Sequence, residues 1–195
     1  MFMLLALSGI ASAEKVKEPS YQEVVKTAVS AGFTAAPTPQ DAGSGLIITP
    51  LAPIPGLYYE YNVNSQRTYG NKFQLAAING IRLQFENTTD SVMVVSWKDS
   101  TMSVNNISGG MPFISGMKYK DAGNPAATPN TIIPPRQKVQ VDAYISSVKL
   151  HGTMWVINGA PLLRDTELLF TYYLNATVNN EASYITVICP GIAVP

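Results

Sequence analysis

The stretch that decides the fold is Ile81-Arg82-Leu83-Gln84-Phe85-Glu86-Asn87-Thr88-Thr89-Asp90, followed by a second apolar segment from Val92 to Trp97. Apolar residues alternate with Arg82 and Gln84, which is the period-two pattern of a strand with one buried face. Residues 87–90 have the composition of a tight turn. The sequence therefore predicts a hairpin of two antiparallel strands, 81–85 and 92–97.

Further segments with strand patterns lie on both sides of this hairpin. The clearest is Val139-Gln140-Val141-Asp142-Ala143-Tyr144-Ile145, and the others are 57–63, 73–78, 113–119, 154–157, 168–174 and 184–188. Turn residues separate them at the spacing of a sandwich, and no helical crossover connects them. We expect a mostly β protein, with an immunoglobulin-like antiparallel β-sandwich over residues 57–195 and a short helix before it.

The helix is expected within residues 14–33. Pro19-Ser20-Tyr21-Gln22-Glu23 has the pattern of a capping box, and Gly32 is a candidate stop. Apolar residues then recur at helical spacing, namely Tyr21, Val24, Val25, Ala28 and Val29. This apolar stripe can dock on the sandwich or on a partner, and docking within the chain is the simpler interpretation.

Residues 34–56 are rich in Pro, Ala and Gly. Five prolines interrupt any regular element there: Pro37, Pro39, Pro50, Pro53 and Pro55. We expect a semi-extended linker between the helix and the sandwich.

The N-terminus has the pattern of a signal peptide over residues 1–13. An apolar run ends in Ala11-Ser12-Ala13 and is followed at once by charged residues from Glu14. The alternative is a buried N-terminal segment. No cysteine follows the apolar run, and no later stretch has the roughly 20 apolar residues of a membrane span, so we expect a periplasmic or secreted protein without a transmembrane span.

Charge balance and cysteine content limit the partners and bonds that are expected of this chain. The chain has 13 basic and 13 acidic residues among 195, so its formal net charge is zero and nucleic-acid binding is not expected. The single cysteine, Cys189, excludes an intrachain disulfide. It is either a buried small hydrophobe or a reactive thiol, and the apolar stretch before it favours the first interpretation.

No catalytic or metal-binding motif is present in the sequence. His151 is the only histidine, so a histidine metal cluster is excluded and a nucleophilic triad would have to be built around that residue. Acidic residues are scattered, without the spacing of a calcium loop or a glycosidase pair. We therefore expect a protein that is not an enzyme and that uses no cofactor or metal.

Four aromatic residues are candidates for contact with a ligand or partner: Trp97, Trp155, Tyr59 and Tyr61. Tyr59 and Tyr61 point the same way along an expected strand and could form one stacking platform. The alternative, which strand propensity favours, is that the aromatic residues pack in the core.

Residues 81–189 contain an ordered series of motifs. These are Phe85-Glu86-Asn87-Thr88-Thr89-Asp90, Val95-Ser96-Trp97-Lys98-Asp99-Ser100-Thr101-Met102, Gly116-Met117-Lys118-Tyr119-Lys120-Asp121, Thr131-Ile132-Ile133-Pro134-Pro135, the strand from Val139 to Ile145, and Trp155 leading into Pro161-Leu162-Leu163. In their order and spacing they resemble a group of uncharacterised Gram-negative envelope proteins and lipoproteins. The resemblance implies an immunoglobulin-like sandwich and an envelope location, and it implies no particular reaction.

Two main hypotheses of function follow. The first is an exported, non-enzymatic interaction or structural protein of the bacterial cell envelope, which holds an envelope protein partner through sheet edges and long loops. The second is a small-ligand or glycan-binding module that uses exposed Trp and Tyr. A hydrolase built on His151 and Cys189 ranks third.

Overall fold

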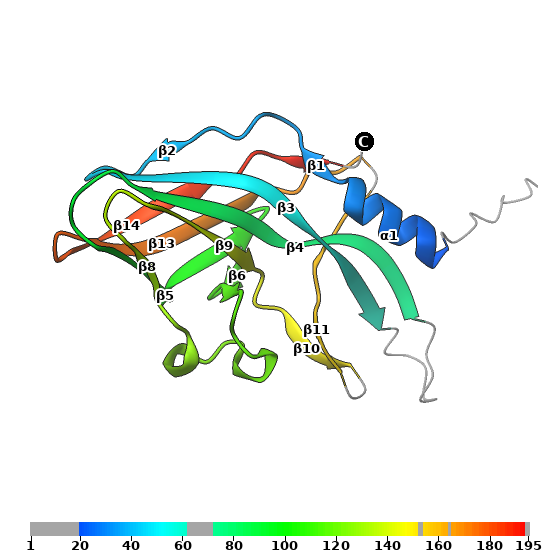
Figure 1. Ribbon diagram of the computed structural model, residues 1–195. Helices are drawn as coiled ribbons and strands as arrows, with labels where there is room; N and C mark the ends of the chain where they lie inside the picture. The colour runs from blue at the N-terminus through cyan, green and yellow to red at the C-terminus, as the bar shows by residue number, and fades with distance from the viewer. Residues whose placement is uncertain (1–19, 62–71, 152–153, 164, 194–195) are drawn as a thin grey trace, which may run out of the picture.

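The computed structural model describes residues 20–61, 72–151, 154–163 and 165–193. This part of the chain is mostly β, with antiparallel sheets and one α-helix near the N-terminus (Figure 1). The expected signal peptide, residues 1–13, lies outside the described residues. Among the described residues, no helix has the length and apolar character needed to cross a membrane.

Two sheets form the body of the molecule, and every strand pair in them is antiparallel. The first sheet contains β2 (Gln40–Asp41), β3 (Leu46–Tyr61), β4 (Lys72–Asn87), β9 (Lys138–Tyr144) and β7 (Phe113–Ile114) in this spatial order, with β12 (Ala160–Pro161) beside β4. The second sheet contains β14 (Glu181–Ile188), β13 (Phe170–Val178), β5 (Met93–Val104) and β6 (Ile107–Gly110), with β8 (Thr131–Ile133) beside β5.

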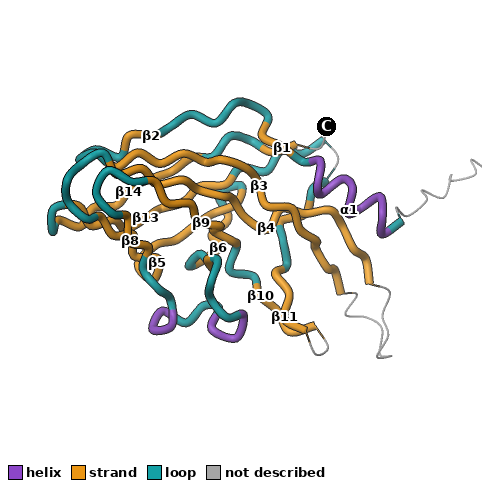
Figure 2. The backbone as a smooth tube through the Cα atoms, viewed as in Figure 1, coloured by secondary structure: helices purple, strands orange, loops and turns teal. Residues whose placement is uncertain are grey.

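Short elements complete the described fold, as the backbone tube of Figure 2 shows. Two small ribbons pair β1 (Gly32–Phe33) with β15 (Ile192–Ala193) and β10 (Val148–His151) with β11 (Met154–Ile157). Two single-turn 3-10 helices, η1 (Tyr119–Asp121) and η2 (Pro125–Ala127), lie in the long connection before β8. The expected strand 113–119 is thus only β7, followed by a turn and η1.

The core lies between the two sheets, as alternation predicts. Phe85 of the first sheet and Trp97 of the second are both fully buried, and their rings meet edge to face with centroids 6.0 Å apart. The Trp97 indole N–H donates to the Thr131 hydroxyl at 2.8 Å. Burying two large aromatic rings with their polar group satisfied joins the sheets at this point.

Tyr172 forms a polar connection between the sheets. It lies on β13, is fully buried, and its hydroxyl accepts from the Ile81 N–H at 3.2 Å and donates to the Ala143 carbonyl at 2.8 Å. Ile81 and Ala143 face each other across β4 and β9. Because burial disfavours the phenolate, the pKa of Tyr172 is raised well above its ordinary value.

The expected hairpin of 81–85 and 92–97 is wrong. Both segments are strands, but β4 belongs to the first sheet and β5 to the second. The turn residues between them carry the chain from one sheet to the other. The buried Asn87 amide holds this crossing by donating to the carbonyls of Ser91, Ile133 and Pro134 at 2.7, 3.2 and 3.1 Å and accepting from the Thr89 N–H and hydroxyl.

The expected linker over 34–56 is also wrong, because β3 begins at Leu46 and runs through most of the prolines. β2 pairs with β3 only at Ile47 and Ile48, so among the described strands the later part of β3 pairs with β4 alone and lies at an edge of the first sheet, where the Leu57 carbonyl accepts from the Gly159 N–H at 3.1 Å. Proline is tolerated at such an edge and at bulges. The register shifts between Pro50 and Ala52 and between Ile54 and Pro55.

The N-terminal helix is confirmed as α1 (Tyr21–Ser30), together with its capping box. The Ser20 N–H donates to the Glu23 carboxylate at 2.6 Å, and the Glu23 N–H donates to the Ser20 hydroxyl at 3.4 Å. The buried stripe is Val24, Ala28 and Ala31, and the helix packs on β3 and β4. Docking within the chain is therefore confirmed, although Val29, which was expected on the buried face, is 68% exposed.

Candidate functional site

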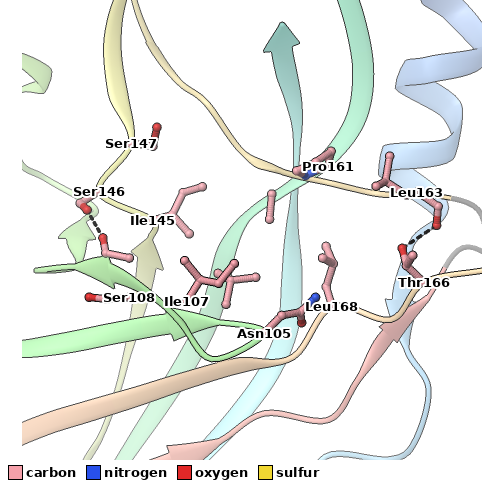
Figure 3. Close-up of a pocket in the computed structure, with 13 residues that line it drawn as sticks. Asn105, Ile107, Ser108, Ile145, Ser146, Ser147, Pro161, Leu163, Thr166 and Leu168 are labelled. Carbon is pink, nitrogen blue, oxygen red and sulfur yellow. Dashed lines mark hydrogen bonds between the residues drawn. The ribbon is translucent and has the colours of Figure 1, made fainter.

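A cavity of about 470 Å³ opens at one end of the two-sheet body, where β5 turns into β6 and β9 gives way to β10 (Figure 3). We call this the open end. The other end, at the crossing held by Asn87, is called the packed end. Residues from both sheets and from two connections line the cavity: Val104, Asn105, Ile107, Ser108, Gly109, Ile145, Ser146, Ser147, Ala160, Pro161, Leu163, Thr166 and Leu168.

The first wall is the β5–β6 hairpin. Its two turn residues, Asn105 and Asn106, have φ angles of 49° and 63°, the left-handed conformation that a two-residue hairpin turn of this kind requires. Asn105 also ties the turn to the segment that leads into β13, because its N–H donates to the Leu169 carbonyl at 2.9 Å and its side-chain oxygen accepts from the Leu169 N–H at 2.7 Å. This wall is therefore held in place without a buried side chain at its tip.

The second wall is the connection from β9 to β10. The Ser146 hydroxyl donates to the Gly109 carbonyl of β6, a bond drawn as a dashed line in Figure 3. The Ser147 carbonyl accepts from the Asn158 N–H at 2.7 Å. The first contact joins the two sheets across one side of the cavity, and the second closes the base of the β10–β11 ribbon.

The third wall runs from β12 to the start of β13. Ala160 and Pro161 pair with β4, which fixes one end of this segment. A turn follows, in which the Thr166 hydroxyl donates to the Leu163 carbonyl at 2.8 Å. Leu168 then forms an antiparallel β-bridge with Ile192 and is buried. Its apolar side chain lines the cavity.

The surface of the cavity is mostly apolar. Ile145 and Leu168 lie in its buried part, whereas Ile107, 75% exposed, and Leu163, 48% exposed, lie at its rim. The polar groups are hydroxyls and an amide, from Asn105, Ser108, Ser146, Ser147 and Thr166, and none of the described lining residues carries a charge. The volume falls in the range of small-molecule pockets.

Some charged side chains of the described residues form ion pairs away from the cavity. Arg82 and Asp142 lie 2.7 Å apart across β4 and β9, and this hydrogen bond raises the pKa of Arg82. Arg136 and Asp90 lie 2.8 Å apart near the packed end, where the hydrogen bond from Arg136 lowers the pKa of Asp90. Such exposed pairs stabilise the fold little.

Of the four aromatic residues predicted to make contacts, Trp97 is contradicted by the structure. Its side chain is fully buried between the sheets and its N–H is already bonded to Thr131. Tyr59 and Tyr61 lie at the end of β3 and Trp155 lies in β11, but their side chains are outside the described part of the molecule. None of the four is among the described residues that line the cavity.

The described part of the structure shows no site that contains both Cys189 and His151, the two residues considered for nucleophilic chemistry. Cys189 is 2% exposed, and burial raises the pKa of its thiol to about 12, which confirms the interpretation of a buried small hydrophobe. His151 lies in β10 and not in a loop as expected, and its side chain is outside the described residues. Among the described residues, no group of three His, Cys, Asp or Glu side chains could hold a metal ion.

Sequence reasoning did not find the cavity. One local signal was available, because Asn105-Asn106 before Ile107 is typical of a two-residue hairpin turn that leaves an apolar side chain at the surface. The remaining walls come from residues 145–147 and from lining residues between Ala160 and Leu168, and the proximity of these two groups depends on long-range strand pairing. No family model, curated protein or solved structure matches this chain.

Proposed function

We propose that this chain is a non-enzymatic binding protein that takes up an uncharged, largely apolar ligand in the cavity at the open end. The observation that carries this proposal is a cavity of about 470 Å³ with a mostly apolar surface and no charge among its described lining residues. An apolar ligand would bury Ile145 and Leu168 further and cover the exposed side chains of Ile107 and Leu163. Removal of this apolar surface from water supplies the driving force.

The polar groups of the cavity favour a neutral head group. Asn105 and Ser146 already use one side-chain bond each within the protein, so they offer only their remaining capacity to a ligand. A charged group placed here would lose its hydration without a counter-charge among the described lining residues, which is costly. Alcohols, esters and amides with a hydrocarbon body are therefore the ligand class that fits.

The chemistry of the same residues supports a binding role. The Ser146 hydroxyl donates to a backbone carbonyl, and no histidine or carboxylate is among the described residues of the cavity. A hydroxyl without an adjacent base is a weak nucleophile. These features of the cavity favour the small-ligand hypothesis over the envelope protein partner. In this proposal the contact site is the cavity and not the aromatic residues.

We also propose that the protein acts in the bacterial cell envelope after export. The support is the signal-peptide pattern of residues 1–13 and the uncharged, Asn-rich and Thr-rich composition. Expression of the full precursor in a Gram-negative host, followed by fractionation and mass spectrometry, tests this. A periplasmic chain that begins at Glu14 is expected, and a cytoplasmic chain that retains residues 1–13 would contradict export.

The binding proposal is tested with N-phenyl-1-naphthylamine, an uncharged apolar dye that fluoresces when it leaves water. The wild-type protein should bind the dye saturably, and 1-decanol should displace it. Ile107→Glu places a charge at the rim and should weaken binding by about tenfold or more. Circular dichroism verifies that the variant is folded, which is expected because Ile107 is 75% exposed.

The matched control is Ile132→Glu. Ile132 is 61% exposed and lies on β8, which pairs with the start of β5, whereas Ile107 pairs with its end. This substitution adds the same charge to a similarly exposed isoleucine at the packed end and should leave dye affinity unchanged. Equal loss in both variants, or no saturable binding by the wild type, would refute the cavity as the binding site.

A further inference from the structure

The edge strand of the second sheet, β14, presents unpaired backbone groups. Among the described strands, β14 pairs only with β13, and at its C-terminal end the side chain of Gln40 takes the place of a neighbouring strand. The Gln40 amide donates to the Ile188 carbonyl at 2.8 Å and accepts from the Ile188 N–H at 3.0 Å. Both backbone groups of Ile188 therefore point outward, away from β13.

The direction of the other backbone groups follows from this observation. In an antiparallel strand the residues alternate, so that every second residue directs both its N–H and its C=O to the same side. Ala182, Tyr184 and Thr186 share the orientation of Ile188. In the described part of the chain, no backbone or side-chain group bonds to the N–H or C=O of these three residues.

In the described part of the chain, this edge lacks the usual protection against pairing. Protective devices at sheet edges include lysine, proline, bulges and a covering element. β14 has the sequence Glu-Ala-Ser-Tyr-Ile-Thr-Val-Ile, with one charge at its first residue and no lysine or proline. Its first four residues are all exposed, including Tyr184 at 76%. Another strand can therefore approach without a clash or a buried charge.

We propose that β14 pairs antiparallel with β14 of a second copy of this chain, with Tyr184 of each copy opposite Tyr184 of the other. The free edge is bounded on one side by the turn at Asn179 and Asn180, both with positive φ, and on the other by Ile188, which Gln40 covers. Tyr184 lies midway between Asn180 and Ile188. A two-fold axis through Tyr184 thus pairs the whole free edge and nothing beyond it.

The side chains are compatible with this register. Ala182 lies opposite Thr186 of the second copy, and the three outward-facing pairs each exchange two backbone hydrogen bonds. The Glu181 carboxylates lie at opposite ends of the shared ribbon, six residues or about 20 Å apart along the strand direction. The zero formal net charge adds no long-range repulsion between copies.

Sedimentation velocity of the full chain over a range of concentrations tests this pairing. The wild type should show a reversible dimer. Tyr184→Pro removes one outward N–H and leaves the bonds to β13 intact, so it should weaken the dimer by about tenfold or more while circular dichroism stays native. Thr186→Lys, which adds charge to the same edge, should act in the same direction and serves as a second edge variant.

The matched control is Tyr173→Ala. Tyr173 is 42% exposed on β13 and pairs with Thr186, so this change removes a ring from the same sheet face and leaves the edge unaltered. It should retain the dimer. A wild-type chain that stays monomeric at every concentration, or a dimer that persists unchanged in both edge variants, would overturn the proposal. These outcomes are independent of dye binding in the cavity.

Discussion

The packed end and the open end of the sandwich are formed by the same long strands but are filled differently. At the packed end, Phe85 and Trp97 fill the space between the sheets and Asn87 binds the crossing loops with its amide. At the open end, Val104 and Ile145 face a cavity of about 470 Å³. β5 contributes Trp97 to the packed end and Val104 to the lining of the cavity.

The difference shows how one fold separates stability from binding. Tight aromatic packing and a satisfied polar network hold the sheets together at one end. An unfilled apolar cavity forfeits contacts, and the chain supports it with hydrogen bonds from Asn105 and Ser146 instead of with large side chains. We therefore expect substitutions at the packed end to change folding and substitutions at the open end to change binding.

The largest expected effect is that of Trp97→Ala at the packed end. It removes a fully buried ring and its bond to Thr131, so the free energy of unfolding should fall by about 3–5 kcal/mol. Urea denaturation followed by circular dichroism measures the loss. A loss below about 1 kcal/mol would mean that Trp97 is not a packing centre.

Asn87→Ala should have the next largest effect. It leaves the carbonyls of Ser91, Ile133 and Pro134 without the amide donor, and the free energy of unfolding should fall by about 2–4 kcal/mol. Asn87→Asp is the informative comparison, because it keeps the acceptor for Thr89 and replaces the donating amide nitrogen with an oxygen that repels the three carbonyls. If Asn87→Asp were as stable as the wild type, the donor bonds would not hold the crossing.

Cys189 tests whether the interior beside the cavity stays dry. Its N–H donates to Phe170, the first residue of β13, and the pKa of its thiol is raised from 9.0 to about 12 in the folded chain. Because the unfolded thiolate forms above pH 9, the stability from this group is complete below that pH and is lost as the pH rises toward 12. Between pH 8 and 10.5 the loss is about 2 kcal/mol.

This contribution is isolated by comparison with Cys189→Ala. The free energy of unfolding of wild type should fall more steeply between pH 8 and 10.5 than that of the variant. Iodoacetamide should also label the native wild-type thiol far more slowly than the urea-unfolded thiol. Parallel pH curves for the two proteins, or rapid native labelling, would show that water reaches the Cys189 thiol in the folded chain.

Ile107→Ala should have the smallest effect on folding. The side chain is 75% exposed, so the free energy of unfolding should change by less than about 0.5 kcal/mol. Affinity for 1-decanol should nevertheless fall, because most of the apolar surface of the Ile107 side chain at the rim is lost. A large loss of stability, measured by the same urea titration, would show that the rim belongs to the core and would weaken the contrast between the two ends.

Local features of the fold could be predicted from the sequence. The capping box of Ser20 and Glu23 depends on residues three apart, and it forms as expected. Alternation also placed strands over residues 139–145, 154–157 and 184–188, where β9, β11 and β14 lie. These predictions need only the direction of neighbouring side chains.

Strand partners could not be predicted in the same way. The turn at Asn87 fits a hairpin locally, but Phe85 and Trp97 meet across the core instead of side by side in one sheet. Prolines suggested a linker, although Pro50 and Pro53 are tolerated because β2 covers only the start of β3. The cavity depends on the same long-range pairing, so its residues could not be grouped from the sequence.

The central claim is that the open end binds an uncharged apolar ligand while the packed end stays closed. Its most direct test is a methyl NMR titration of isoleucine-labelled protein with 1-decanol. We predict saturable shifts for Ile107 and Ile145 and no shifts for Ile48 and Ile133, which are fully buried outside the cavity lining. Absence of saturable shifts at Ile107 and Ile145, or equal shifts at all four residues, would contradict the claim.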